Sequence, residues 1–293
     1  MRVAVEIGMH GNEEAESQFG FKLRKSLKEN PPSLEGSSVI DVFSHHQDAI
    51  EANVRHVSQS LDVSFPSRYS YASNFAGEGE DEYETAAEMN DTYTSGKYDV
   101  KIATHHNRYR NGLHVCVTPD GFLRVSKRSL AIASHLGTKR VVLIDSAFHK
   151  AVGLTGSLDL EIPLCSPKNI ARQVELYRRK FVGLAHRTVD ELPDVDLHKF
   201  TFYKLTTEIP RNEAEDLRLK EFKIIRRFQE LPREAVSRLG LEENGKCYAM
   251  SWNFNHFSST DEQGRRTMFG AVVHRGVFDH AAKNNASRHL LIE

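Results

Sequence analysis

The sequence has few of the features that would place a protein in a specialised class. Its 293 residues include only three cysteines, Cys116, Cys165 and Cys247, which are widely spaced and form no Cys-x-x-Cys pair. This argues against a disulfide framework and against a cysteine-built zinc knuckle, and it favours a reducing cytoplasm. No apolar run reaches membrane-spanning length, and Met1 leads directly into an expected strand without a targeting segment. We therefore expect a cytoplasmic protein with no membrane partner.

An excess of charge of one sign is also lacking. Lysine and arginine together number 39 and aspartate and glutamate 40, which gives a formal net charge of −1. Such a chain has no overall field that attracts nucleic acid, so no nucleic-acid partner is expected, and any recognition must be local. A content of 39% hydrophobic and 27% charged residues is that of a soluble protein with one large or two modest cores. Homo-oligomerisation is left open.

Apolar residues recur at two spacings along the first two thirds of the chain. Runs typical of buried strands alternate with segments in which apolar residues recur every three or four positions, as in helices. The expected strands cover 2–7, 38–43, 98–107, 139–145 and 157–164, and the expected helices cover 14–29, 125–136 and 167–184. This alternation predicts an α/β domain over residues 1–195, in which helices flank a sheet.

The pattern changes near Pro193, where acidic residues cluster. Beyond this point strand-like stretches replace the alternating units, separated by turn sequences such as residues 243–246. The expected strands cover 199–209, 221–229, 247–254 and 267–273. We therefore expect a smaller, mostly-β C-terminal domain over residues 196–293.

The segment Gly8-Met9-His10-Gly11-Asn12-Glu13 follows the first expected strand. Its glycines permit a sharp turn, so His10 lies on the turn and Glu13 near the start of the next helix. An imidazole and a carboxylate three residues apart have the spacing of half a zinc site. The ordinary alternative is a glycine turn with a solvent-exposed histidine and a glutamate that favours the positive end of the helix dipole.

A second pair of histidines ends the strand expected over residues 98–107. If this strand runs parallel to the first, both carboxyl ends lie at one edge of the sheet, where open α/β sheets keep their sites. His106, or its neighbour His105, is then the candidate for a third zinc ligand.

Glu161 interrupts the apolar run of residues 157–164. A carboxylate between Leu160 and Ile162 is costly to bury without partners. Either this strand lies at a sheet edge, or Glu161 faces a polar cleft.

Three further stretches have ordinary interpretations. His45 and His46 follow the second expected strand and face either the site or solvent, and of the two we expect solvent. The acidic stretch 77–90 is expected to be a solvated helix face. Residues 53–74 are rich in serine and irregular, which in a compact domain indicates a functional loop.

Taken together, His10-Gly11-Asn12-Glu13, His106-Asn107, and Glu161 before Pro163 and a helix carry a resemblance. In order and spacing, over nearly the whole chain, the sequence resembles the aspartoacylase and succinylglutamate desuccinylase family, which is itself similar to zinc carboxypeptidases.

This resemblance implies that His10, Glu13 and His106 bind one Zn²⁺ per chain and that Glu161 is the general base. It implies a zinc carboxypeptidase-like mixed sheet flanked by helices, with a C-terminal β domain that narrows the cleft. The activity implied is zinc-dependent hydrolysis of the amide bond of a small N-acyl substrate, such as an N-acyl amino acid. Zinc lowers the pKa of the attacking water and polarises the carbonyl, while the glutamate takes and returns the proton.

The chain departs from the family pattern in its substrate-binding residues. Members usually carry Asp-Leu-Asn-Arg before Phe-Pro, and the Asn-Arg pair grips the substrate carboxylate. This chain has Leu61-Asp62-Val63-Ser64-Phe65-Pro66, which lacks the pair, and Phe278 stands where a tyrosine is usual. The candidate replacements for the pair are Arg55, Arg68, Arg108 and Arg110, and Asn53 and Asn107 are further candidates for contacts with the substrate. We expect Arg108 to act near the carbonyl oxygen, and N-acetylaspartate and succinylglutamate to be poor substrates.

Three classes of function remain. An amidohydrolase needs Glu161 together with all three ligands. A carboxypeptidase-like peptidase needs an arginine for the terminal carboxylate, and the missing Asn-Arg pair weakens that hypothesis. A metal-binding but catalytically reduced protein would gain nothing from Glu161. A phosphate-binding loop at residues 8–11 is disfavoured because the loop lacks both the Lys-Ser/Thr and the three-glycine patterns.

Overall fold

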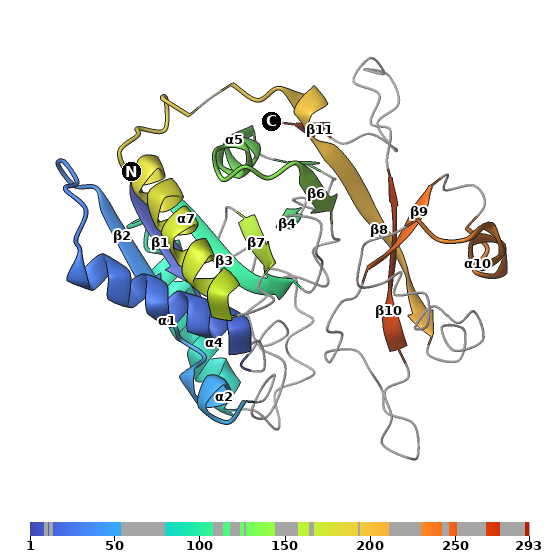
Figure 1. Cartoon of the computed structure of the whole chain (residues 1–293), viewed down its shortest axis with the longest axis horizontal. Helices are drawn as coiled ribbons and strands as arrows, with labels where there is room; N and C mark the ends of the chain where they lie inside the picture. The colour runs from blue at the N-terminus through green and yellow to red at the C-terminus, as the bar shows by residue number, and fades with distance from the viewer. Residues whose placement is uncertain are drawn as a thin grey trace.

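A mixed β-sheet organises the part of the chain that the computed structural model describes, namely residues 1–8, 11, 14–53, 80–107, 114–117, 124–125, 127–143, 158–163, 167–192, 194–210, 230–241, 246–250, 268–275 and 291–292. Nine strands of this part form one sheet, in the order β2-β1-β3-β7-β4-β6-β8-β10-β9 (Figure 1). They are β1 (Arg2–Glu6), β2 (Val39–Phe43), β3 (Val100–Asn107), β4 (His114–Val117), β6 (Arg140–Leu143), β7 (Leu158–Pro163), β8 (Thr201–Pro210), β9 (Cys247–Met250) and β10 (Met268–Arg275). Two short strands, β5 (Arg124–Val125) and β11 (Leu291–Ile292), pair separately.

Helices cover the first half of this sheet. The helical segments are α1 (Glu14–Glu29), α2 (Gln47–Glu51), α4 (Glu80–Thr94), α5 (Lys127–His135), α7 (Pro167–Ala185), α10 (Arg233–Arg238) and the short 3₁₀ helix η2 (Leu197–Lys199). In Figure 1, α1 and α7 lie side by side across the strands near the N-terminus. Within the described residues, no helix is both long and apolar enough to cross a membrane.

The strands that lead toward the candidate site run parallel. β1 lies between β2 and β3 and is parallel to both, and β3 is parallel to β7. β4 then pairs antiparallel with β7, whereas β6 is parallel to β4 and to β8. The sheet is therefore mixed, and the expected α/β class is confirmed.

The C-terminal strands extend the same sheet. The first residues of β8 pair with β6, while most of β8 pairs antiparallel with β10, which in turn pairs with β9. The pairing of strands is thus continuous from β6 through β8 to β10 and β9 (Figure 1). The boundary at residue 195 stays a prediction, and the strand expected over 221–229 lies outside the described residues.

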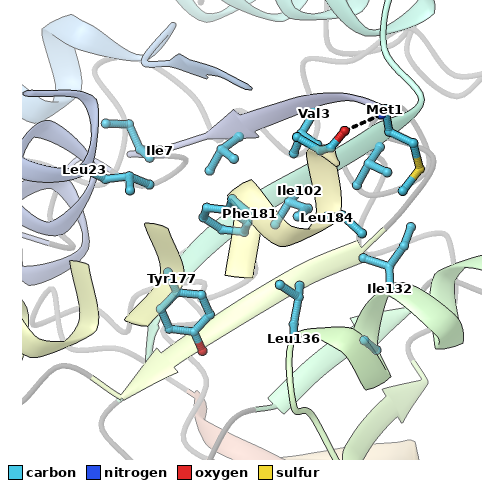
Figure 2. Close-up of a cluster of buried hydrophobic side chains, with 14 of the residues drawn as sticks. Met1, Val3, Ile7, Leu23, Ile102, Ile132, Leu136, Tyr177, Phe181 and Leu184 are labelled. Carbon is cyan, nitrogen blue, oxygen red and sulfur yellow. Dashed lines mark hydrogen bonds between the residues drawn. The ribbon is translucent and has the colours of Figure 1, made fainter. Parts of the chain in front are cut away.

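Alternation along β1 builds a core on both faces of the sheet. Val3, Val5 and Ile7 are fully buried in a cluster with Phe19 of α1 and Phe181 of α7. Figure 2 shows side chains of this cluster gathered between the strands and α7. On the opposite face, α4 supplies a second buried cluster. That cluster consists of Ala4, Ala86, Met89, Tyr93, Tyr98 and Ala103. Successive strand residues point to opposite faces, which is why one strand feeds both clusters.

Two helical glycines differ in the space that surrounds them. A Cβ on Gly20 of α1 would lie 2.6 Å from the Cβ of Ile7 and closer still to two of its methyl carbons. A Cβ on Gly183 of α7 would meet only the His135 ring, at 3.5 Å. The closeness of α1 to β1 therefore requires glycine at position 20 and leaves room for a side chain at position 183.

We accordingly predict opposite signs for two identical substitutions. Gly20→Ala should lower the free energy of unfolding by about 1–3 kcal/mol, because overpacking exceeds the gain in helix propensity. Gly183→Ala should raise it by up to about 1 kcal/mol, because only the propensity changes. Urea denaturation of both variants checks this, and equal effects of the two would show that α1 does not pack against Ile7 as described.

Candidate active site

The parallel strands bring three chain segments to one edge of the sheet. Because β3 is parallel to β1, the carboxyl ends of both strands lie at the same edge, as the sequence required for a shared site. β7 ends at that edge too, since it is parallel to β3. The register of β3 and β7 pairs His105 with Glu161 and His106 with Ile162. A candidate ligand and the candidate base thus occupy neighbouring backbone positions.

Glu161 lies in a central strand. β7 is paired with β3 on one side and with β4 on the other. The alternative in which this carboxylate is tolerated because its strand is an edge strand is therefore wrong.

Several predicted site residues lie outside the described residues. They are His10, Glu13, Arg55, Arg68, Arg108 and Arg110, together with the substituted segment 61–66 and Phe278. For His106, Asn107 and Glu161 the structure gives the backbone position, in β3 and β7. Asn53 is exposed and has a φ of 51° just after α2, where its N–H donates to the carbonyl of Ile50. Ending a helix in this way is common for asparagine.

The glycines that flank His10 have a packing reason. Gly8 has a φ of +70°, and a Cβ there would lie 2.9 Å from Cγ1 of Ile50 and closer still to its Cδ1. A Cβ on Gly11 would lie 2.5 Å from the backbone nitrogen of Ile50 and would overlap the carbonyl of Ala49. Glycine at these two positions therefore allows the turn after β1 to approach α2.

One buried carboxylate links this turn to β3. Glu16, in the first turn of α1, is fully buried. Its Oε2 accepts the N–H of Gly8 at 2.7 Å, and its Oε1 accepts a short hydrogen bond from the hydroxyl of Thr104. Thr104 lies in β3 immediately before His105, and its hydroxyl is also 3.1 Å from the carbonyl oxygen of Glu6.

A second buried carboxylate, that of Glu6, lies at the end of β1. It accepts hydrogen bonds from the N–H of His45 at 2.9 Å and from the hydroxyl of Tyr93 at 2.5 Å, and Nδ1 of His45 lies 2.7 Å from it. The other ring nitrogen of His45 is 3.3 Å from Thr92 Oγ1. Only 12% of the His45 side chain is exposed, so the expectation that His45 faces solvent is wrong.

The expectation for His46 is wrong as well, since only 3% of this residue is exposed. The two histidines follow β2 and precede α2, where the chain packs back onto the sheet. For His45 the buried Glu6 provides the partner that makes burial of an imidazole tolerable.

Glu6 contributes to the raised pKa values of both of its ring partners. Burial alone lowers the pKa of His45, but its hydrogen bond to Glu6 and the negative charge of that carboxylate outweigh burial, so the pKa is raised above 6.5. Burial, followed by the charge of Glu6, raises the pKa of Tyr93 well above its usual value. When His45 is protonated, its ring and the neutral Tyr93 hydroxyl both donate to this carboxylate.

This pair predicts a pH-dependent contribution to stability. Since the pKa of His45 is higher in the folded than in the unfolded chain, its contribution is complete below about pH 6.5 and is lost as pH rises through the folded pKa. The difference in unfolding free energy between wild type and His45→Asn should therefore shrink as pH rises above about 6.5. In a Glu6→Gln background this pH dependence should disappear. A difference that stays constant with pH in the wild-type background would contradict the assignment.

The fold and the sheet edge define the class to which this protein is similar. It has an α/β architecture with a mixed sheet and a candidate site at the carboxyl ends of parallel strands, and this is the fold of succinylglutamate desuccinylase and aspartoacylase family structures. The structure of a succinylglutamate desuccinylase from Chromobacterium violaceum matches with a TM-score of 0.65 at 16% identity, over 94% of this chain and 84% of that one.

Two further structures match with a TM-score of 0.50. The succinylglutamate desuccinylase/aspartoacylase from Rhodobacter sphaeroides is 13% identical, over 94% of this chain and 86% of that one. Murine aminoacylase 3 is 16% identical, over 72% of each chain. No protein-family model and no curated protein sequence matches the chain. At these identities the likeness establishes the fold.

Proposed function

We propose that the protein is a zinc-dependent amidohydrolase that removes the acyl group from an N-acyl amino acid or a related small amide. The observation that carries this proposal is the parallel arrangement of β1, β3 and β7, in which the register sets His105 beside Glu161. The resemblance in fold to desuccinylase and aminoacylase structures supports it.

The donor set fits zinc. Two imidazoles and one carboxylate leave a fourth position open, as in catalytic zinc sites. We propose His10, Glu13 and a histidine of the pair His105–His106 as the three ligands. Among the side chains that the structure describes, no three of His, Cys, Asp or Glu cluster closely enough to hold a metal, and the proposed ligands lie outside that set.

The sequence motif and the strand register favour different histidines as the third zinc ligand. The sequence favours His106, which precedes Asn107 as in the family motif. The register of β3 and β7 instead makes His105 the neighbour of Glu161. The register therefore keeps His105 as a second candidate for the third ligand.

In this proposal Glu161 and Arg108 have separate roles in the hydrolysis. A zinc ion, when bound, would supply a Lewis acid that polarises the carbonyl and lowers the pKa of water. Glu161 would accept a proton from the attacking water and return it to the leaving amine, so that the carboxylate is regenerated after each turnover. Arg108, close in sequence to the histidine pair, would donate to the carbonyl oxygen as negative charge develops on it.

The substrate is proposed to be less acidic than those of the family. Without the Asn-Arg pair, a second carboxylate loses a charge-assisted contact worth about 1.5–3 kcal/mol. Arg55, Arg68 and Arg110 are the candidates for the contact to the remaining carboxylate, with Asn53 and Asn107 as polar neighbours. Neutral N-acyl amino acids should therefore be hydrolysed in preference to N-acetylaspartate.

Glu161→Gln tests the proposed function. The amide keeps the shape of the side chain but cannot accept the proton of water, so kcat should fall by about 10²-fold to 10⁴-fold. Zinc content, measured by elemental analysis after purification without added metal, should stay near one per chain in wild type and variant. The substrates are a panel of N-acyl amino acids, with wild type assayed in parallel.

Three results would count against the proposal. Wild-type turnover by Glu161→Gln would remove the general base from the mechanism. Absence of zinc from the wild-type protein, with no binding on addition, would remove the metal. A variant that keeps zinc but unfolds at lower urea would assign Glu161 a structural role.

A further inference from the structure

The burial of Glu16 calls for an explanation. Glutamate is almost never fully buried unless it has partners, and a glutamate in a first helical turn can favour the helix dipole while it remains in water. Glu14, in the same turn, does so: it is exposed and accepts a hydrogen bond from Gln18. Glu16 is instead fully buried. Helix formation alone does not require its carboxylate.

The contacts of Glu16 join three elements. Its two oxygens accept from different partners, the N–H of Gly8 at 2.7 Å and the hydroxyl of Thr104. Gly8 lies in the turn after β1, Glu16 in α1 and Thr104 in β3. Hydrogen bonds to a charged acceptor are the stronger class, so this single side chain holds the three segments together.

Each of these residues is a near neighbour in sequence of a proposed zinc ligand. Gly8 is two residues before His10, and Thr104 is one residue before His105. Glu16 itself is three residues after Glu13, which is about one turn of helix. The carboxylate therefore connects every segment that has to supply a ligand. A metal site needs its ligands held to within about 0.5 Å, which three separate segments do not achieve without a brace.

We infer that Glu16 is a positioning residue that sets the spacing of the ligand-bearing turn, α1 and β3, and so determines the affinity of the site for zinc. This rests on the proposed zinc site. Glu16 would act through the backbone of Gly8 and through Thr104, without contact to the metal. Its effect should therefore appear in zinc affinity and not only in stability.

Glu6 provides a matched control. It is also a buried carboxylate, 1% exposed, at the same end of β1. Its side chain, however, binds His45 and Tyr93, which belong to the β2–α2 connection and to α4. Glu6→Gln should lower the free energy of unfolding about as much as Glu16→Gln, while leaving the hydrogen bonds of Glu16 to Gly8 and Thr104 in place.

The test compares zinc affinity in the full-length protein. The wild type, Glu16→Gln and Glu6→Gln are stripped with a chelator, and the zinc Kd is measured by competition with a chromophoric chelator. A glutamine at position 16 lacks the negative charge that strengthens both hydrogen bonds and carries an amide N–H where Glu16 accepts from Thr104, so its Kd should rise about 10-fold to 100-fold. The Kd of Glu6→Gln should stay within about twofold of wild type. Urea unfolding of the metal-free proteins gives the stability of each.

Thr104 provides a second, independent arm. Thr104→Val removes the hydroxyl at nearly constant shape and should raise the Kd in the same direction as Glu16→Gln. Thr104→Ser keeps the hydroxyl and should retain wild-type affinity. This arm decides the question if Glu16→Gln does not fold.

The outcomes separate the inference from the function on which it rests. Wild-type zinc affinity in both Glu16→Gln and Thr104→Val would overturn the positioning role while leaving the zinc site intact. Equal losses of zinc affinity in Glu6→Gln and Glu16→Gln would show that Glu16 only stabilises the fold, and this result would also overturn the positioning role. A wild-type protein that binds no zinc would instead overturn the proposed function itself.

Discussion

The parallel pairing of β1 with β2 and β3 determines where the helices pack and where the candidate ligand segments lie. Parallel strands need apolar cover on both faces, and here α1 and α7 supply it on one face and α4 on the other. Parallel strands also end at a common edge, so the turn after β1 and the histidines of β3 are brought to one place. Had β3 run antiparallel to β1, the two candidate ligand segments would lie at opposite edges of the sheet.

Close to that edge the core contains two carboxylates. Glu6 and Glu16 are almost completely buried, and each accepts hydrogen bonds from partners on other elements. A sheet designed for stability alone would have apolar residues there, since buried carboxylates carry a large desolvation cost. Departures of this kind are expected where a fold supports a site. Glu6 ties β2 and α4 to the end of β1, and Glu16 ties α1 and β3 to the turn beyond it.

Local patterns in the sequence were sufficient for most elements near the site. Helical spacing of apolar residues predicts α1, Pro167 marks the start of α7, and Gly137, with a φ of +79°, closes the turn after α5. Features that depend on distant partners were missed. The burial of His45 depends on Glu6, 39 residues away, and the burial of Glu16 depends on Thr104, 88 residues away. The register that sets His105 beside Glu161 is likewise a property of paired strands, so the choice of third ligand could not be made from spacing alone.

The proposed function requires a metal ion at the common edge of β1, β3 and β7. Anomalous X-ray diffraction from crystals of the zinc-loaded protein, recorded above and below the zinc absorption edge, tests it most directly. One strong peak per chain is expected, about 2.0–2.2 Å from the side chains of His10 and Glu13 and from one imidazole of the His105–His106 pair. A peak elsewhere on the chain, or an edge of the sheet without any anomalous signal, would contradict it.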